Sequence, residues 1–190
     1  MANNLRDMVH KKAAKDDVKR SWQWYQSNVR NASANMSAQK FLGDNIAHQS
    51  SKISVGSMIQ YFYDPKGKKE LPYYDKFPLV LPFSADATHF TGLNLHYISP
   101  LHRAVLLDKL MQYVSDDTLT PQSKFNFTWN MLKSASGLPE IKHCVKQYLF
   151  GHVKSNYIVI PPVEWKFVCW LPLERFSGAT NEQVWSASRK

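Results

Sequence analysis

The chain has 190 residues, of which 44% are hydrophobic and 13% aromatic, a composition that favours one globular domain over a disordered chain. No run approaches the roughly 20 apolar residues of a membrane-spanning helix, and the N-terminal segment lacks the apolar block of a signal sequence, so we expect a cytosolic product. The formal net charge of +9 suits contact with phosphate backbones or with an acidic protein partner. We expect the two cysteines, Cys144 and Cys169, to be buried reduced thiols.

Residues 1–52 predict a basic helical arm and linker, since they contain no proline and only one glycine. Trp22 and Tyr25 belong to an apolar stripe at helical spacing, which could dock on the body, on another subunit or on DNA. The cations before this stripe are Lys11, Lys12, Lys15, Lys19 and Arg20.

Three short strands are predicted in the next part of the chain. The first covers 53–63 and ends at an Asp-Pro turn. The second covers only 79–81, between Pro78 and Pro82. Because prolines cannot donate ladder hydrogen bonds, this strand either lies at a sheet edge or is bounded by its two prolines. The third, over 91–98, alternates apolar with polar residues, which predicts two faces of different polarity.

A basic loop joins the first two strands. Lys66, Lys68 and Lys69 surround a glycine, and their ammonium groups, together with backbone amides, could hold a phosphate. A solvated hairpin tip is the alternative interpretation. Tyr73 and Tyr74 follow the loop and suit either the core or an interface.

Residues 99–151 predict a block of three helices. Ser-Pro and Thr-Pro pairs open the first two, and the third carries an apolar stripe over 141–149 that stops at Gly151. A strand at 156–162 returns to the sheet, and a capping box predicts a last short helix after Thr180.

The expected fold class is therefore α+β. It comprises a small bent antiparallel sheet or SH3-like barrel, with a three-helix insertion at about 99–151 and the N-terminal helical arm. The expected domains are the arm and linker, 1–52, and a single α+β body, 53–190.

Catalytic motifs are missing from the sequence. It contains no HExxH, no CxxC and no glycine-flanked serine nucleophile. His96 and His102, with Asp86 and His89 upstream, would suit a metal site, but no zinc-ligand spacing accompanies them. We therefore expect that the protein is not an enzyme and that it has no catalytic residue, no cofactor and no bound metal. The least favoured alternative is a hydrolase that depends on His96 and His102.

Three stretches of the body resemble a family of phage virion proteins. They read YFYDPKGKKELPYYDKFPLVLPF, GLNLHYISPLHRAVLLDKL and KSNYIVIPPVEWKFVCWLPLERFSGATNEQVWSASRK. Over about residues 55–190 they are similar to the DNA end protector, or head-completion, family of T-even-like contractile-tailed bacteriophages. The resemblance implies a structural virion protein, made in the host cytoplasm, that binds and protects the packaged DNA end at the portal or neck.

Its expected partners are other virion proteins and the double-stranded DNA end, in an oligomeric assembly without a membrane. The alternative is a neck, tail or baseplate assembly protein that contacts other virion subunits and not DNA. Charge and placement predict which residues contact phosphates without sequence preference. These are Lys66, Lys68, Lys69, Arg103, Lys142, Lys146, Lys154, Lys11, Lys12, Lys15, Lys19 and Arg20. The residues predicted at interfaces are Trp22, Tyr25, Tyr73, Tyr74 and Trp185.

Overall fold

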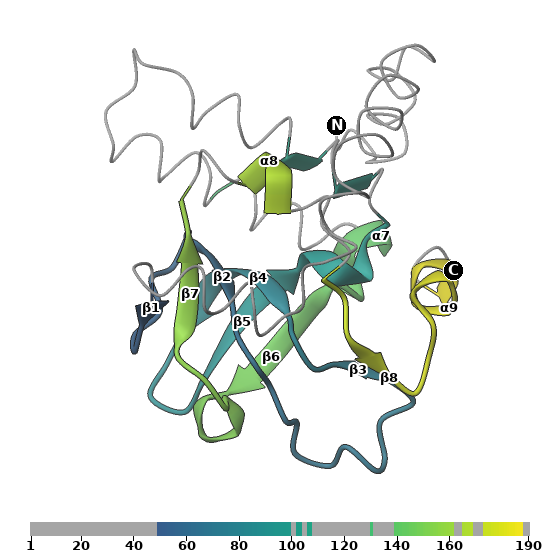
Figure 1. The fold of residues 1–190 in the computed structure, drawn as a ribbon, viewed down its shortest axis with the longest axis horizontal. Coiled ribbons are helices and arrows are strands. Elements are labelled where there is room, and N and C mark those ends of the chain that lie inside the picture. The colour runs from purple at the N-terminus through teal and green to yellow at the C-terminus, as the bar shows by residue number, and fades with distance from the viewer. Residues whose placement is uncertain are drawn as a thin grey trace.

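The body is built around an antiparallel sheet of six strands in the order β1-β7-β2-β4-β5-β6, beside a two-stranded sheet of β3 and β8 (Figure 1). The strands are β1 (Gln49–Ser50), β2 (Met58–Gln60), β3 (Tyr74–Asp75), β4 (Leu79–Ala85), β5 (His89–Asn94), β6 (Val145–Leu149), β7 (Tyr157–Ile160) and β8 (Phe176–Ser177). The helical segments whose bounds lie within the described residues are η3 (Leu95–Tyr97), α7 (Pro139–Lys142), η4 (Phe150–His152), α8 (Trp165–Val168) and α9 (Asn181–Ala187). The computed structural model describes residues 49–99, 102–103, 106–107, 130, 139–161, 165–168 and 173–187.

Residues 1–48 of the predicted arm and linker, with its cations and with Trp22 and Tyr25, lie outside the described residues. Gln49 and Ser50, near the end of the predicted linker, form β1, which pairs with β7. Within the part that is described, no helix combines the length and apolarity needed to cross a bilayer.

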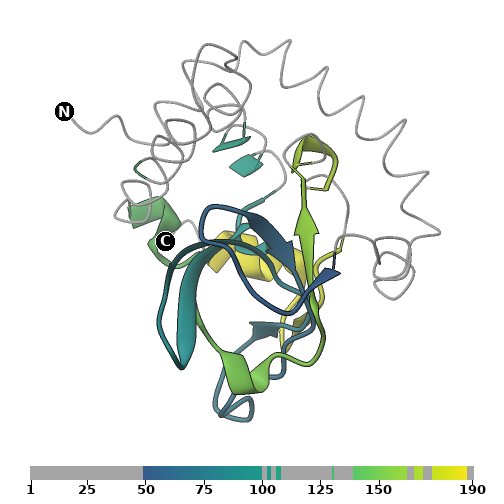
Figure 2. The same ribbon diagram turned by 90° about the vertical axis from the view of Figure 1, so that its left-hand side faces the viewer.

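Both faces of the six-stranded sheet are buried, and Figure 2 shows how strongly the sheet curves. Met58, Leu79 and Leu81 belong to one hydrophobic cluster, while their neighbours Ile59 and Val80 belong to another. Successive side chains of a strand point to opposite faces, so a strand that is covered on both sides reads as a continuous apolar run. This explains why the segment around residue 80 lacks a regular alternation.

Strand β4 is longer than predicted and lies in the middle of the sheet, so its placement at an edge or between bounding prolines was wrong. It pairs with β2 through Leu79 and Val80 only, and Pro82 lies beyond that pairing. On the other side Pro82 faces Gly92, with a register shift before Ser84. A proline is tolerated at such an irregularity because the ladder there needs no N–H from it.

The strand predicted over 91–98 ends earlier, at Asn94, and continues as the 3₁₀ segment η3. The side chain of Asn94 accepts a hydrogen bond from the His96 N–H at 2.9 Å, which caps this turn. Both polar residues are fully buried, and both contact Asp75, whereas the apolar residues of this segment belong to the hydrophobic core.

The three-helix insertion was also wrong, because the described region is mostly sheet. Residues 145–149, predicted as part of the third helix, form β6, which pairs with β5 along its whole length. Among residues 141–149, all of which are described, helical structure is limited to the end of α7. Apolar residues spaced at i, i+3 and i+4 predict a helix, but long-range strand pairing overrides this local preference. Val145 and Tyr148 also suit a strand, because β-branched and aromatic residues favour strands. Most of the first two predicted helices lies outside the described residues.

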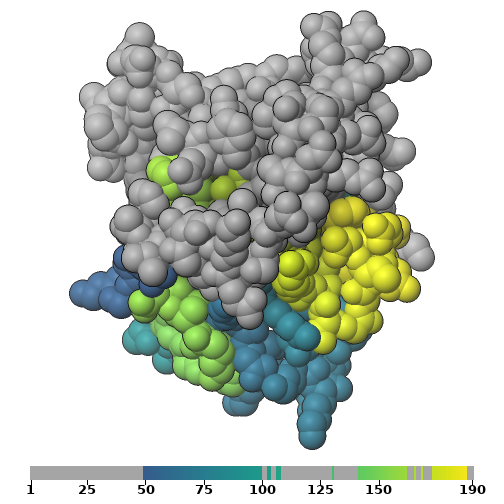
Figure 3. Space-filling model, in the orientation of Figure 1, coloured from purple at the N-terminus to yellow at the C-terminus, as the bar shows by residue number. Residues whose placement is uncertain are grey.

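The C-terminal part agrees with the sequence analysis. The returning strand is β7, and α9 begins with the predicted capping box. In it the Thr180 N–H donates to Gln183 Oε1 at 2.9 Å, and the Gln183 N–H donates to Thr180 Oγ1 at 3.3 Å. The space-filling view in Figure 3 shows the C-terminal segment (yellow) against the blue-to-teal surface of residues 49–99.

Candidate nucleic-acid interface

The basic loop between β2 and β3 has a defined conformation. Gly67 adopts a φ of 69°, a value that glycine reaches without strain, and its carbonyl accepts a hydrogen bond from the Glu70 N–H at 2.8 Å. The Lys68 Nζ lies 2.9 and 3.1 Å from the two carboxylate oxygens of Asp64. The Asp64 N–H donates to the His152 carbonyl at 3.0 Å. The loop is thus tied to itself and to η4.

The ion pair between Lys68 and Asp64 stabilises the ionised forms of both side chains. The hydrogen bond from Lys68 lowers the pKa of the Asp64 carboxyl, and the nearby positive charges of Lys154 and His152 lower it further. The same hydrogen bond raises the pKa of Lys68. Both side chains keep their charges across the physiological range.

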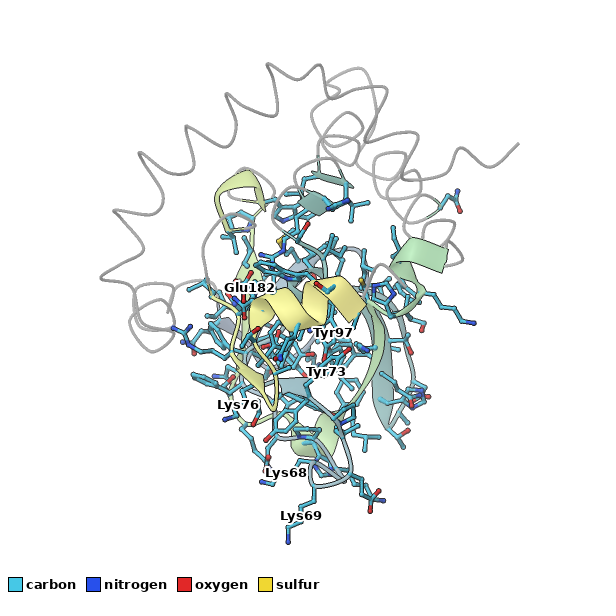
Figure 4. All side chains as sticks on the ribbon, turned by 90° about the vertical axis from the view of Figure 1, so that its right-hand side faces the viewer. Lys68, Lys69, Tyr73, Lys76, Tyr97 and Glu182 are labelled. Carbon is cyan, nitrogen blue, oxygen red and sulfur yellow. The ribbon has the colours of Figure 1, made fainter. Side chains whose placement is uncertain are left out.

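The fold adds cations to the loop from distant parts of the sequence. The Lys154 N–H donates to the Phe62 carbonyl at 2.8 Å, which places Lys154 beside the start of the loop. The Lys76 carbonyl accepts from the Tyr63 N–H at 3.0 Å, and the Lys76 N–H donates to the Arg175 carbonyl at 2.9 Å. Figure 4 shows Lys68 and Lys69 at one end of the body, with Lys76 between them and α9.

We call this surface the basic tip. Its exposed cations are Lys66, Lys68, Lys69, Lys76, Lys154 and Arg175. Six cations against the two carboxylates of Asp64 and Glu70 leave a net charge of +4. Such a concentration of positive charge attracts polyanions.

Sequence reasoning identified four of the six cations and missed Lys76 and Arg175. These two are brought together by the pairing of β3 with β8, in which Tyr74 faces Ser177 and Asp75 faces Phe176. The proximity of Lys76 to the lysine-rich loop was the available signal; no local pattern marks Arg175.

Two predicted DNA contacts lie away from the basic tip. Lys142 is exposed on α7, which is at the opposite end of the body from the β2–β3 loop (Figures 1 and 2). Lys146 is half-buried, with its Nζ 4.3 Å from the centre of the Tyr97 ring. Burial lowers the pKa of Lys146. Its side chain is engaged within the protein.

Arg103 is likewise internal, with 1% of its surface exposed. Its Nη2 forms a buried ion pair with the carboxylate of Glu174, and its Nε donates to the Ile98 carbonyl at 2.6 Å. Its guanidinium lies 5.8 Å from the centre of the Trp185 ring. A side chain held in this way cannot reach a phosphate, so Arg103 is not part of the interface proposed below.

Of the aromatic residues predicted at interfaces, Tyr73, Tyr74 and Trp185 are described, and all three are partly buried within the protein. The Trp185 Nε1–H donates to the His96 carbonyl at 2.9 Å. The Tyr73 ring lies 6.1 Å from that of Tyr97, beneath α9 in Figure 4. Tyr74 is half-buried in β3. These contacts attach α9 and β3 to the rest of the body.

A buried polar cluster supports the basic tip from inside. The Asp75 carboxylate lies 2.7 Å from His96 Nδ1 and accepts hydrogen bonds from the Phe77 N–H at 3.0 Å and from Asn94 Nδ2 at 3.3 Å. The Arg175 N–H also approaches it, at 3.4 Å. Asp75 thereby joins β3 to β5, to η3 and to the segment before β8.

Burial and the neighbouring groups shift the pKa of Asp75 in opposite directions. Burial alone would raise the pKa of Asp75, but the charge of His96 and the hydrogen bonds to the carboxylate hold it below its ordinary value. His96 Nε2 has no hydrogen-bond partner among the described residues, while His102 Nδ1 lies 2.6 Å from Ser99 Oγ. In the described part of the chain, no group of three or more His, Cys, Asp or Glu residues could hold a metal ion.

The chain matches the model of a known protein family. The family model described as "Phage T4 terminal DNA protecting protein" matches residues 1–189, which include the segment predicted to form the N-terminal arm. Neither the curated proteins nor the solved structures contain a significant match. A match over nearly the whole chain, in a protein with an exposed basic surface, shows that the chain belongs to the family of phage T4 terminal DNA protecting proteins.

Proposed function

We propose that this protein binds the end of a packaged phage genome through the basic tip and shields it. The observation that carries the proposal is the net charge of +4 on one exposed surface in a member of this family. Lysine and arginine side chains release condensed counterions when they contact phosphates, which yields affinity without base recognition. Binding should therefore be independent of sequence.

The protein acts, in this proposal, as a structural component of the virion and not as an enzyme. It is made in the host cytoplasm and is built into the particle at the portal or neck, where other virion subunits are its partners. The cations of the N-terminal arm add to the electrostatic attraction. A polar, basic arm of this kind suits contacts that form during assembly.

The salt dependence of duplex binding tests the interface. For the double variant Lys66→Ala/Lys69→Ala, the slope of log K against log salt should be shallower by about 1.8, since each phosphate contact contributes about 0.9. Lys142→Ala is the matched control, because it removes an exposed lysine outside the basic tip. Equal slopes for the double variant and the control would exclude the basic tip as the DNA contact.

Protection is tested separately with an exonuclease. The wild-type protein should slow digestion of a linear duplex, and added salt should abolish this effect. If the protein binds no linear duplex even at low salt, DNA-end protection is the wrong function. The basic tip would then be assigned to an acidic virion subunit, as in an assembly protein of the neck, tail or baseplate.

A further inference from the structure

Leu71 is the one large apolar side chain that is exposed among the described residues, with 43% of its surface accessible. It directly follows the lysines and Glu70 of the basic loop. Single exposed leucines are ordinary on protein surfaces. Two further features set Leu71 apart, namely its fixed position and its cationic surroundings.

The backbone on both sides of Leu71 is held in place. Before it, the Gly67–Glu70 turn is closed by a hydrogen bond of 2.8 Å. After it, Pro72 packs so closely on Gly178 that a Cβ atom at Gly178 would lie 2.5 Å from the Pro72 carbonyl oxygen. Leu71 is therefore presented to solvent by a constrained loop, and little conformational entropy is lost when it makes a contact.

The surroundings of Leu71 indicate what that contact is. Lys69 and Lys68 precede it by two and three residues, and both belong to the basic tip. A partner that complements this loop offers an apolar surface next to negative charge. The end of a DNA duplex has this character, because the outer face of its terminal base pair is unstacked and is flanked by phosphates. Leucine is among the apolar side chains that minor-groove proteins insert between base pairs, so such a side chain can pack on the face of a base pair.

We propose that Leu71 packs on the exposed face of the terminal base pair while the surrounding lysines contact the phosphates. The contact rests on the proposed DNA-binding function and deepens it, since it distinguishes an end from the interior of a duplex. Phosphate contacts alone are the same along the whole duplex. Leu71 is thus the residue that gives the preference for ends.

The size of the effect follows from the exposed fraction. Burial of about two-fifths of a leucine side chain raises affinity by about threefold to tenfold, and Leu71 has 43% of its surface left to bury. Leu71→Ala should therefore weaken binding to duplex ends by about threefold to tenfold. Leu71→Met, which keeps the apolar volume, should retain most of the affinity.

The test uses the full-length chain and three DNAs: a short blunt-ended linear duplex, a dumbbell of equal length with hairpin-closed ends, and a closed circle. The wild-type protein should prefer the linear duplex, because hairpin loops cover the terminal pairs of the dumbbell. Leu71→Ala should lose this preference without change in its affinity for the circle, and Leu71→Met should keep it. Equal urea midpoints of the three proteins establish that all are folded.

Several results would overturn the inference. If Leu71→Ala keeps the wild-type preference for open ends, or weakens binding to all three DNAs equally, Leu71 does not recognise the terminal base pair. If Leu71→Ala binds DNA normally but fails to enter particles, Leu71 contacts another virion subunit instead. Failure of the wild-type protein to bind any duplex refutes the proposed function itself, which is a different result from loss of end preference alone.

Discussion

Replacement of Arg103 by methionine should destabilise the protein strongly and leave its intrinsic contact with DNA unchanged. Methionine occupies a similar length but removes the cation that faces Glu174. It also removes the donors to the carbonyls of Ile98, at 2.6 Å, and His96, at 3.3 Å. The carboxylate of Glu174, which is 6% exposed, would be left buried without that partner.

Breaking one side of a buried ion pair in this way costs about 3–5 kcal/mol. This is a large part of the roughly 5–15 kcal/mol by which domains are stable. A double variant, Arg103→Met/Glu174→Leu, replaces both charges by apolar groups and should recover much of the loss, because no unpaired charge remains. The two single changes should therefore be strongly non-additive.

Urea unfolding measures these differences. With a denaturant slope of about 2 kcal/mol per molar, a loss of 3–5 kcal/mol lowers the midpoint by roughly 1.5–2.5 M. Salt-dependent DNA binding, measured at a temperature at which the variant is folded, should keep the wild-type slope.

Two outcomes would refute the reasoning. The first is a double variant as unstable as the sum of its single changes, which would mean that the two charges do not interact. The second is an Arg103→Met protein with normal stability and with a salt slope shallower by about 0.9, which would make Arg103 a phosphate contact.

Three further predictions concern the body. Gly92→Ala should destabilise the protein by about 1–3 kcal/mol through overpacking, because the new Cβ would lie 2.4 Å from Val80 Cγ1. Urea unfolding should show a smaller loss of stability when the same change is made in a Val80→Ala background. Gly178→Ala should also destabilise, by at least about 1 kcal/mol, because its φ is +90° and Pro72 blocks the new Cβ; a thermal melting point equal to wild type would contradict this. The pKa of Asp75 is below its ordinary value of 3.8, so its contribution to stability is full above about pH 4 and is lost as the pH falls below that value. Asp75→Asn should therefore be less stable than wild type at pH 6, and the difference should shrink at pH 3; an equal difference at both pH values would exclude the charge of Asp75 as the cause.

Local signals predicted the parts of the fold that depend on neighbours in the chain. The basic loop and the capping box at Thr180 are such features. A turn or a cap is formed by groups a few residues apart, so its residue types suffice to identify it.

Long-range pairing decided what the sequence analysis had wrong. Residues 145–149 carry spacings that fit a helix, but β5 lies beside them and completes their hydrogen bonds as a strand. Pro82 suggested the end of a strand, yet an irregularity in the β4–β5 pairing accommodates it. A sequence pattern that spans a few residues does not predict either pairing.

In the candidate site, too, some residues could be predicted from local sequence and others depend on the fold. Its lysine-rich loop could be identified from sequence, whereas the presence of Lys76 and Arg175 on the same surface depends on the pairing of β3 with β8. Arg103 was a plausible surface cation until the fold placed Glu174 against it, 71 positions away. A charged side chain in the sequence does not indicate whether it will be solvated or paired in the core.

The sequence by itself determined the net positive charge, the basic loop and membership of the family, because these depend on composition and on motifs along the chain. Only the tertiary structure decided which cations share a surface, which are withdrawn into ion pairs and cation–π contacts, and that Leu71 stands exposed among the lysines. The physical reason is that exposure and proximity result from packing between segments far apart in the chain, and packing is a property of the whole fold.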